Sequence, residues 1–309
     1  MYSKKRRAAF LSIISNSTLI ILKLIVGFAV NSIAVISEAL HSGIDLIASF
    51  VAYFSIKKAS VPADSQHKYG HGKYENIAGV AEALLITFAA VLIVIKAVNE
   101  IKKGVSLETV DMAIGVMFIS CIANWLVSGY LFRVAKETES VALEADGWHL
   151  RTDVYTSLGV FAGLIVVRLT GLKILDPILA IFVAVLIFSI SIKITKESVG
   201  GLLDESLPDE EEKVIKEILS EHYNQFVEFH ELRTRRAGSE RHIDLHLILF
   251  GATHLEDAHE LCDHLESDIL EKFPNSKILI HLEPCRTKTD CVQDCKKCTI
   301  AEANSNHSP

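Results

Sequence analysis

Six stretches of this chain are apolar over lengths that can cross a bilayer, and this feature limits the fold more than any other. They lie near residues 8–30, 33–56, 77–99, 110–133, 142–169 and 176–196. A helix rises about 1.5 Å per residue, so roughly 20 residues cross about 30 Å of hydrocarbon. Half of the 309 residues are hydrophobic, which is typical of a membrane class rather than a soluble one. The sequence therefore predicts an all-α membrane domain of six transmembrane helices.

Basic residues predict how these helices are oriented. With the N-terminus inside, the inner segments carry twelve lysines and arginines and the outer segments carry five. Cytoplasmic loops of membrane proteins have such an excess. The basic start "KKRR" resembles that of a signal peptide, but the apolar run after it is too long and has no clear cleavage site. We therefore expect a retained first helix, with both termini in the cytosol and the protein in the plasma (inner) membrane.

The back portion of the chain has a different character. Residues 1–200 hold 19 Lys and Arg against 15 Asp and Glu, whereas residues 201–309 hold 12 against 23. That acidic balance argues against nucleic-acid binding. Periodicity predicts a helix, two strands, a helix and a third strand, at 208–222, 227–236, 241–250, 253–273 and 277–284. We expect a transmembrane domain over 1–206, a cytosolic α+β domain of order α-β-β-α-β over 207–286, and a flexible tail over 287–309.

Two of the apolar stretches carry a histidine and an aspartate one helical turn apart. The pairs are His41 with Asp45 in "HSGID", and His149 with Asp153 in "HLRTD". Residues i and i+4 share a helix face, and ionised groups in a bilayer cost several kcal/mol each unless something offsets that cost. Two imidazoles and two carboxylates that face one another make a tetrahedral site that suits Zn(II).

The alternative is that these residues are unrelated polar groups that pack helices together. The matched pairs favour the metal site, as does the fact that only four histidines occur in the first 200 residues and all lie in this pattern or in the loop motif below. For the other polar residues within the stretches, we expect roles in helix packing or in an access path rather than as metal ligands. They are Asn16, Glu38, Glu82 and Asn124.

Two further groups of metal-ligating residue types follow. The loop "PADSQHKYGHGKYE" offers Asp64, His67 and His71, with the two histidines spaced to share a helix start; a solvated loop explains them equally well. In the back portion, alternation places His242, Asp244 and His246 on one strand face, and His281 and Glu283 on one face of another. With His230 and His259 nearby, this predicts a second metal centre, against the alternative of a histidine-rich polar sheet face.

Four cysteines lie near the end of the chain: Cys285, Cys291, Cys295 and Cys298. Four thiolates can close a zinc site, but this spacing matches no standard finger and few apolar residues surround it. A reduced tail that binds metal only adventitiously is the equal alternative.

These motifs resemble the cation diffusion facilitator family, especially its bacterial ferrous-iron and zinc efflux branch. The resemblance runs to about residue 286 and rests on "HSGID", "HKYGHGK", "ADGWHLRTD", "DESLPDEE", "HELRTRRAG", "HIDLHL", "AHEL" and "IHLEP". It implies a homodimeric metal/proton antiporter with a metallochaperone-like cytosolic domain. It also implies a transport site of His41, Asp45, His149 and Asp153, and a loop site of Asp64, His67 and His71. The implied dimer-bridging cytosolic site consists of His230, His246, His259, His281 and Glu283.

Two departures from that branch bear on metal choice. The branch usually has Asp at the positions of His41 and Glu283. An imidazole makes the transport site softer and less negative, which favours Zn(II) over Mn(II) and leaves Fe(II), Cd(II) and Co(II) open. We expect export of Zn(II) from the cytosol, with protons as counter-ions and Zn(II) also as a regulatory ligand.

Other functional classes are a membrane metalloenzyme and a membrane-anchored metal sensor. A catalytic zinc site usually keeps three protein ligands and a water, whereas all four ligands here are committed and no HExxH is present. The sequence therefore favours a secondary transporter over an enzyme. Metal movement into sealed vesicles separates a transporter from a sensor.

Overall fold

The computed structural model describes residues 2–29, 33–103, 111–171, 174–251 and 253–285. The chain divides into two compact units, Met1–Leu203 and Asp204–Pro309.

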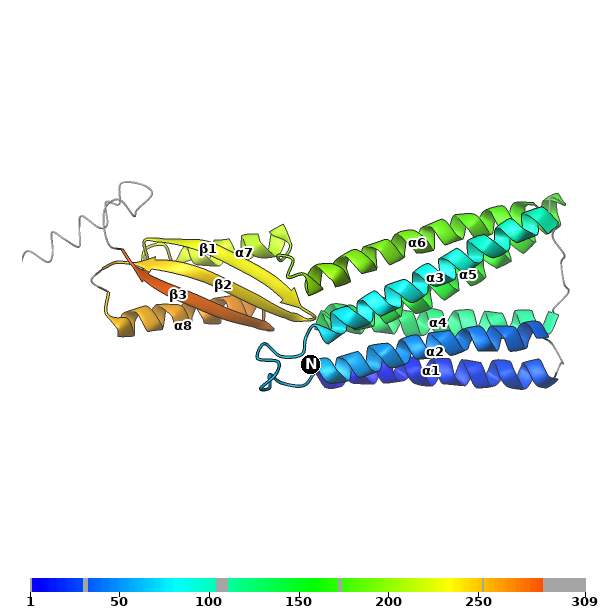
Figure 1. Ribbon diagram of the computed structural model, residues 1–309, viewed down its shortest axis with the longest axis horizontal. Helices are drawn as coiled ribbons and strands as arrows, with labels where there is room; N and C mark the ends of the chain where they lie inside the picture. Colours follow the sequence, from blue (N-terminus) through cyan, green and yellow to red (C-terminus); the bar gives the residue numbers. More distant parts are fainter. Residues whose placement is uncertain (1, 30–32, 104–110, 172–173, 252, 286–309) are drawn as a thin grey trace, which may run out of the picture. The chain divides into compact units, whose positions relative to one another are not determined.

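The first unit consists, over its described residues, of six long helices that run alongside one another (Figure 1). They are α1 (Tyr2–Ala29), α2 (Ile33–Ala59), α3 (Tyr74–Lys103), α4 (Asp111–Thr138), α5 (Val141–Thr170) and α6 (Leu175–Leu202). Helix α1 packs on α2, α3 packs on α6, and α5 contacts α3, α4 and α6.

Four stretches within these helices are long and apolar enough to cross a bilayer, among the described residues. They are Tyr2–Ala29, Tyr74–Lys102, Phe118–Thr138 and Pro177–Leu202. Helices α2 and α5, with 27 and 30 residues, have the length but are not among the four. These are the two helices that carry the predicted HxxxD pairs. The helical membrane domain is confirmed, and six crossings stay a prediction.

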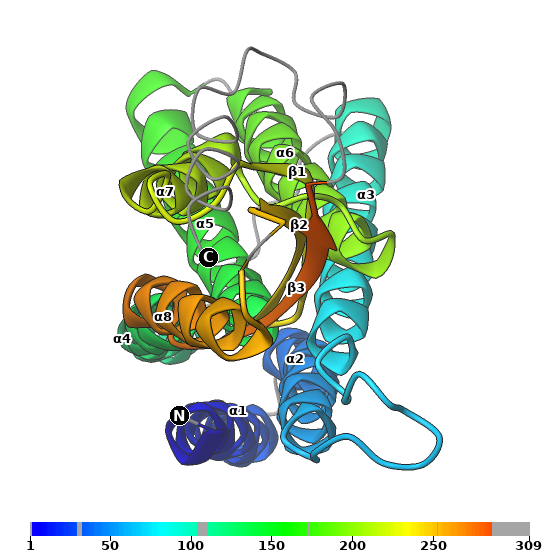
Figure 2. The same cartoon turned by 90° about the vertical axis from the view of Figure 1, so that its left-hand side faces the viewer.

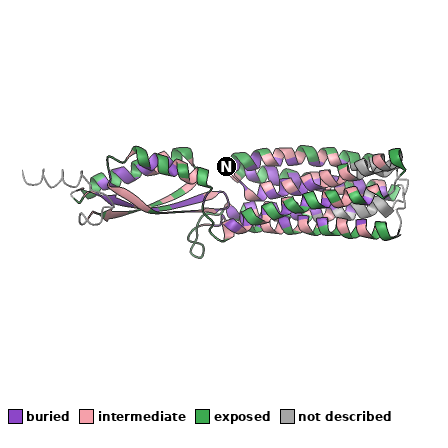
Figure 3. Cartoon of the chain, turned by 90° about the horizontal axis from the view of Figure 1, so that it is seen from above, coloured by how far each residue is buried: buried purple, intermediate pink, exposed green. Residues whose placement is uncertain are grey.

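Side chains of this unit are distributed as expected for helices in lipid. Small residues such as Ala52, Ala83 and Ala90 are buried between helices, while large apolar residues such as Phe88 and Phe182 are exposed. Figure 3 shows buried and exposed residues alternating along each helix. The burial of small side chains lets backbones approach closely, which is how membrane helices gain packing energy.

Glycines mark the closest approaches between helices. A Cβ on Gly79 of α3 would lie 2.2 Å from Ser198 Oγ of α6. One on Gly159 of α5 would lie 2.6 Å from Val183 Cγ2 of α6. A larger residue at either position would therefore require the facing side chain or helix α6 to shift.

A buried ion pair joins α1 to α3. The Nζ atom of Lys5 lies 2.6 Å from Glu75 Oε1, and the two side chains are 0% and 1% exposed. The hydroxyl of Ser140, at the α4–α5 junction, donates to Glu75 Oε2 at 2.5 Å. Three segments that are distant in sequence are thus tied together at one end of the unit.

The second unit has the order α7 (Asp209–Glu221), β1 (Glu228–Ala237), β2 (Glu240–Leu249), α8 (Leu255–Lys272) and β3 (Ser276–Pro284). The sheet order is β1-β2-β3, with β1 antiparallel and β3 parallel to β2. Helices α7 and α8 lie on the same side of the sheet (Figure 2). A small sheet with helices is what the sequence predicts for this part of the chain.

One face of this sheet forms the core of the unit. Ile243, Leu245 and Leu247 of β2 are at most 1% exposed and pack with Ile215 of α7 and Leu265 of α8. Because side chains alternate along a strand, His246 and its neighbours in adjacent strands lie on the opposite face. The hydrophobic face thus positions the histidines away from both helices.

Candidate metal centres

Three residues of the predicted transport site lie together inside the first unit. One ligand atom from each of Asp45, His149 and Asp153 lies within 4.8 Å of the other two. Asp45 is on α2, and the other two are on α5, one turn apart. The Nε2 atom of His149 is 3.2 Å from Asp45 Oδ1. Asp45 and His149 are 6% and 4% exposed, so the two helices bring nitrogen and oxygen donors together in a buried place.

The fourth predicted ligand, His41, lies on α2 one turn before Asp45, and its side chain is outside the part of the chain that the structure describes. Two asparagines border the cluster. Asn124 Nδ2 donates to Asp153 Oδ2 at 3.5 Å, and Asn16 Nδ2 donates to the backbone oxygen of Asp45 at 3.3 Å. Asn16 therefore ties α1 to α2, and Asn124 orients a carboxylate of the cluster.

Two more buried acids lie near His149. Glu82 of α3 is 0% exposed, and its Oε2 is 3.6 Å from His149 Nδ1. Asp146 is also 0% exposed, and its Oδ1 accepts a hydrogen bond from Ser49 at 3.3 Å. Asp146 was not among the predicted ligands, and Glu82 was predicted to have a packing or access-path role. The signal for Asp146 was present, since it lies one turn before His149 on the same helix face.

The loop between α2 and α3 brings Asp64, His67 and His71 together within 4.8 Å. Asp64 Oδ2 is 3.3 Å from His71 Nε2, and Asp64 Oδ1 is 3.4 Å from His67 Nδ1. The buried His71 ring also lies 3.1 Å, through Nδ1, from the carbonyl oxygen of Val61. If the Nδ1 atom carries the proton, this contact leaves Nε2 free to accept a cation.

The two loop histidines do not share a helix start, because α3 begins only at Tyr74. Gly70, with φ of 87°, turns the chain between them, a conformation that a side chain disfavours. The backbone N–H groups of His67 and Gln66 donate to Asp64 Oδ1. The backbone hydrogen bond from His67 is the main cause that holds the pKa of Asp64 below its usual value. The imidazoles of His67 and His71 also lower this pKa. The carboxylate is thus ionised and ready for a cation.

In the second unit, three histidines form a row across the sheet. His230 pairs with His246 between β1 and β2, and His246 pairs with His281 between β2 and β3. The ring centroids are 5.2 Å and 4.7 Å apart. Glu283 lies beside all three, with Oε1 2.9 Å from His246 Nδ1. Ligand atoms of His230, His246 and Glu283 lie within 4.8 Å of one another.

His259 lies elsewhere in this unit. It is on α8, 75% exposed, with Nδ1 3.7 Å from Asp263 Oδ1. Its predicted part in a site shared by two protomers stays a prediction. A carboxylate that the sequence did not indicate, Glu231, lies 3.8 Å from His246 Nε2. Glu231 sits at a β-bulge with φ of 50°, and no sequence pattern announces such a bulge.

Comparison with known proteins shows the family of this chain. Residues 9–203 match the cation efflux transmembrane domain, and residues 207–285 match the cytoplasmic domain of cation efflux proteins. The chain belongs to the cation efflux, or cation diffusion facilitator, family. It is 33% identical over 253 residues to an uncharacterized transporter of Synechocystis sp., and the aligned region covers 82% of each chain. It is 30% identical to the cation-efflux pump FieF of Yersinia pestis, over 92% of this chain and 94% of that one.

Among solved structures, a chain of CzrB is 42% identical over 25% of this chain and 96% of its own, with a TM-score of 0.25. As a cation efflux family member, the protein is a multi-pass membrane transporter of metal cations.

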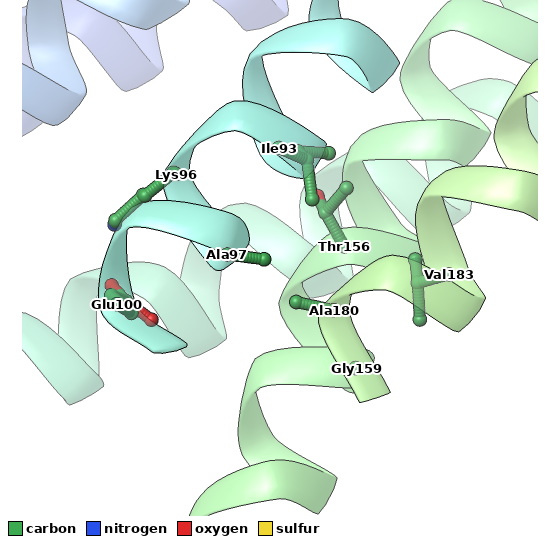
Figure 4. A pocket seen from close by; sticks show the side chains of 8 residues that line it. All are labelled: Ile93, Lys96, Ala97, Glu100, Thr156, Gly159, Ala180 and Val183. Atoms are coloured by element: carbon green, nitrogen blue, oxygen red, sulfur yellow. The ribbon is translucent and has the colours of Figure 1, made fainter. Parts of the chain in front are cut away.

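A cavity of about 180 Å³ lies between α3, α5 and α6 of this family member (Figure 4). It is lined by Ile93, Lys96, Ala97, Glu100, Thr156, Gly159, Ala180 and Val183. Among the described residues that line it, none is Asp45, His149 or Asp153, although Thr156 follows Asp153 by one turn.

Three of the four clustered cysteines follow the matched family domains, which end at residue 285. Cys285 is partly buried and forms no disulfide with another described cysteine. Cys291, Cys295 and Cys298 lie outside the described residues, so the metal site predicted for the tail stays a prediction.

Proposed function

We propose that this protein exports Zn(II) from the cytosol in exchange for protons, and that Asp45, His149 and Asp153, together with His41, bind the transported ion. The observation that carries this proposal is the buried cluster on α2 and α5, inside a cation efflux transmembrane domain. Imidazole nitrogen and carboxylate oxygen together suit Zn(II), whereas Mg(II) and Ca(II) prefer more oxygen ligands. Fe(II), Cd(II) and Co(II) are the secondary substrates that the same donor set accepts.

Proton coupling follows from the ligand chemistry. An imidazole must be neutral and a carboxylate ionised to bind a metal, so metal binding releases protons and protonation releases metal. A single site that is exposed alternately to the two sides of the membrane then exchanges one for the other. The clustered donors are close enough for both reactions to occur at the same atoms.

The transporter acts in the plasma (inner) membrane as a homodimer, with six spans per protomer and both termini in the cytosol. Residues 1–206 form the transport domain, 207–286 the cytosolic domain and 287–309 a cysteine-containing tail. The cytosolic histidine row with Glu283, completed by His259, binds Zn(II) as a regulatory ligand between two protomers, and the Asp64 loop binds a further ion. Support comes from the match to the family's cytoplasmic domain and from the two clusters of donor atoms.

Flux in proteoliposomes tests this function. Purified protein is reconstituted with a zinc-sensitive dye inside the vesicles, and a pH gradient is imposed. Wild type should move Zn(II) in a gradient-dependent way, and Asp153→Ala should abolish the flux. The matched control is Glu144→Ala, which removes a carboxylate from the first turn of the same helix that is not a member of the donor cluster. Flux by Asp153→Ala at the wild-type rate refutes the site, and binding without flux in wild type favours a sensor.

A further inference from the structure

Glu82 holds a position that the proposed transport function does not use. Its side chain enters from α3, a helix that contributes no ligand to the cluster, and it is fully buried. The His149 ring lies between two carboxylates: Nε2 is 3.2 Å from Asp45 Oδ1, and Nδ1 is 3.6 Å from Glu82 Oε2. One nitrogen of the ring thus faces the ligand cluster and the other faces Glu82.

Three atoms at this contact lack a hydrogen bond within the described part of the chain. They are both carboxylate oxygens of Glu82 and Nδ1 of His149. A buried carboxylate without a partner is costly. The separation of 3.6 Å is only a few tenths of an ångström beyond hydrogen-bonding distance. A shift of this size would pair His149 Nδ1 with Glu82 Oε2.

Other roles for Glu82 fit the structure less well. As a direct ligand it would belong to the cluster of donor atoms, which in the described residues consists of Asp45, His149 and Asp153. As a charge partner it would need a cation, and among the described residues the charged groups that act on it are His149, Asp146 and Asp45, of which only His149 can be positive. As a packing residue a carboxylate is a poor choice, since an apolar side chain fills the same volume without the penalty of burial.

The tautomer of His149 supplies the reason for such a partner. Without metal, Nε2 can donate its proton to Asp45, which lies at hydrogen-bonding distance. A cation takes the lone pair of Nε2, and the single proton of the neutral ring must then sit on Nδ1. That N–H needs an acceptor, and Glu82 Oε2 is the nearby oxygen. Metal-ligating histidines almost always donate their second N–H to a carboxylate, carbonyl or water.

We propose that Glu82 is a positioning residue, which accepts the Nδ1–H of His149 and so presents Nε2 to the transported cation. This inference rests on the proposed function, because it requires that His149 bind the ion. Loss of such an outer partner typically lowers metal affinity by about 10- to 100-fold. Glu82 thereby sets the affinity of the site without touching the ion.

Two substitutions separate positioning from simple packing. Glu82→Gln keeps an oxygen that accepts the Nδ1–H, and Glu82→Met fills a similar volume without an acceptor. Leu84→Met, on the exposed face of α3, is the control for the effects of mutagenesis and purification. Each change is made in the full-length protein carrying His71→Ala and His246→Ala, so that the loop and cytosolic clusters are weakened. Adding Asp153→Ala to this background supplies the blank for Co(II) difference spectra.

The readouts are Co(II) affinity from the visible bands, the shape of those bands, and the KM and kcat of Zn(II) flux. Glu82→Gln should remain within about threefold of its parent, while Glu82→Met should lose about 10- to 100-fold in Co(II) affinity, with altered bands and a matching rise in KM. Equal behaviour of Glu82→Gln and Glu82→Met overturns the positioning role. If Asp153→Ala leaves Co(II) binding and Zn(II) flux intact, the proposed function itself fails.

Discussion

The buried pair of Lys5 and Glu75 allows a sharp test of how this membrane unit is held together. At 2.6 Å, two unit charges attract by about 6 kcal/mol at an effective dielectric constant near 20. Removal of both charges from water costs several kcal/mol per ion, so the pair as a whole contributes little net stability. Removal of one partner has a different effect, because the other charge stays buried.

The perturbation is Lys5→Met, which leaves the Glu75 carboxylate with Ser140 as its hydrogen-bond donor. An orphaned buried charge destabilises by about 3–5 kcal/mol, equivalent to roughly 6–20 °C in Tm for a domain of this size. The second change, Glu75→Gln, removes the orphaned charge and keeps an acceptor for Ser140. The double variant should therefore recover most of the loss.

Thermal unfolding in detergent, followed by size-exclusion chromatography after heating, measures all three variants. Lys4→Met is the matched control, because Lys4 pairs with Glu137 on the surface, where the side chains are 54% and 44% exposed. Such a surface pair contributes about 0–1 kcal/mol. A shift for Lys5→Met no larger than that for Lys4→Met, or additive losses in the double variant, would refute this account of the pair.

Further outcomes follow from other parts of the molecule. Burial is the main cause that lowers the pKa of His242, so the folded domain favours the neutral ring. The stability of this domain to urea should therefore fall as the pH drops below about 6.5. The fall should be less steep in His242→Gln. Gly159→Ala should lower the Tm, because the added Cβ would lie 2.6 Å from Val183 Cγ2. The clash should cost about 1–3 kcal/mol of stability. Adding Val183→Ala should restore part of the lost stability. Deletion of residues 287–309 should raise the apparent KM for Zn(II) at an unchanged maximal rate if the cysteines deliver metal, and identical kinetics would contradict that role.

The sequence was sufficient to predict the helices and strands and many of the residues in each cluster of metal-ligating side chains. Strand β2 at Glu240–Leu249 and helix α8 at Leu255–Lys272 lie within two residues of the ranges read from periodicity, because a hydrophobic face repeats every two or 3.6 residues. The pair of His149 and Asp153 was visible because both residues lie on one helix face.

Relations between elements were not visible in the same way. The approach of Glu82 to His149 depends on how α3 is rotated against α5, and no local pattern encodes that rotation. The bulge that brings Glu231 to His246 interrupts alternation without a glycine to announce it. The helix start expected at the loop histidines was wrong by a few residues, because Gly70 adopts a positive φ just before α3.

The histidine row across the sheet has a mechanical consequence. His281 belongs to β3, an edge strand whose ladder partner in the described sheet is β2 alone. A cation held by His230, His246 and Glu283 would cross-link all three strands and fasten that edge in place. Amide hydrogens of β3 should then exchange with solvent at a rate that depends on zinc concentration, while those in the middle of β2 stay protected. Metal binding would thus add to the ladder with β2 and to the core packing of Ile278, Ile280 and Leu282, which hold β3 in the absence of metal.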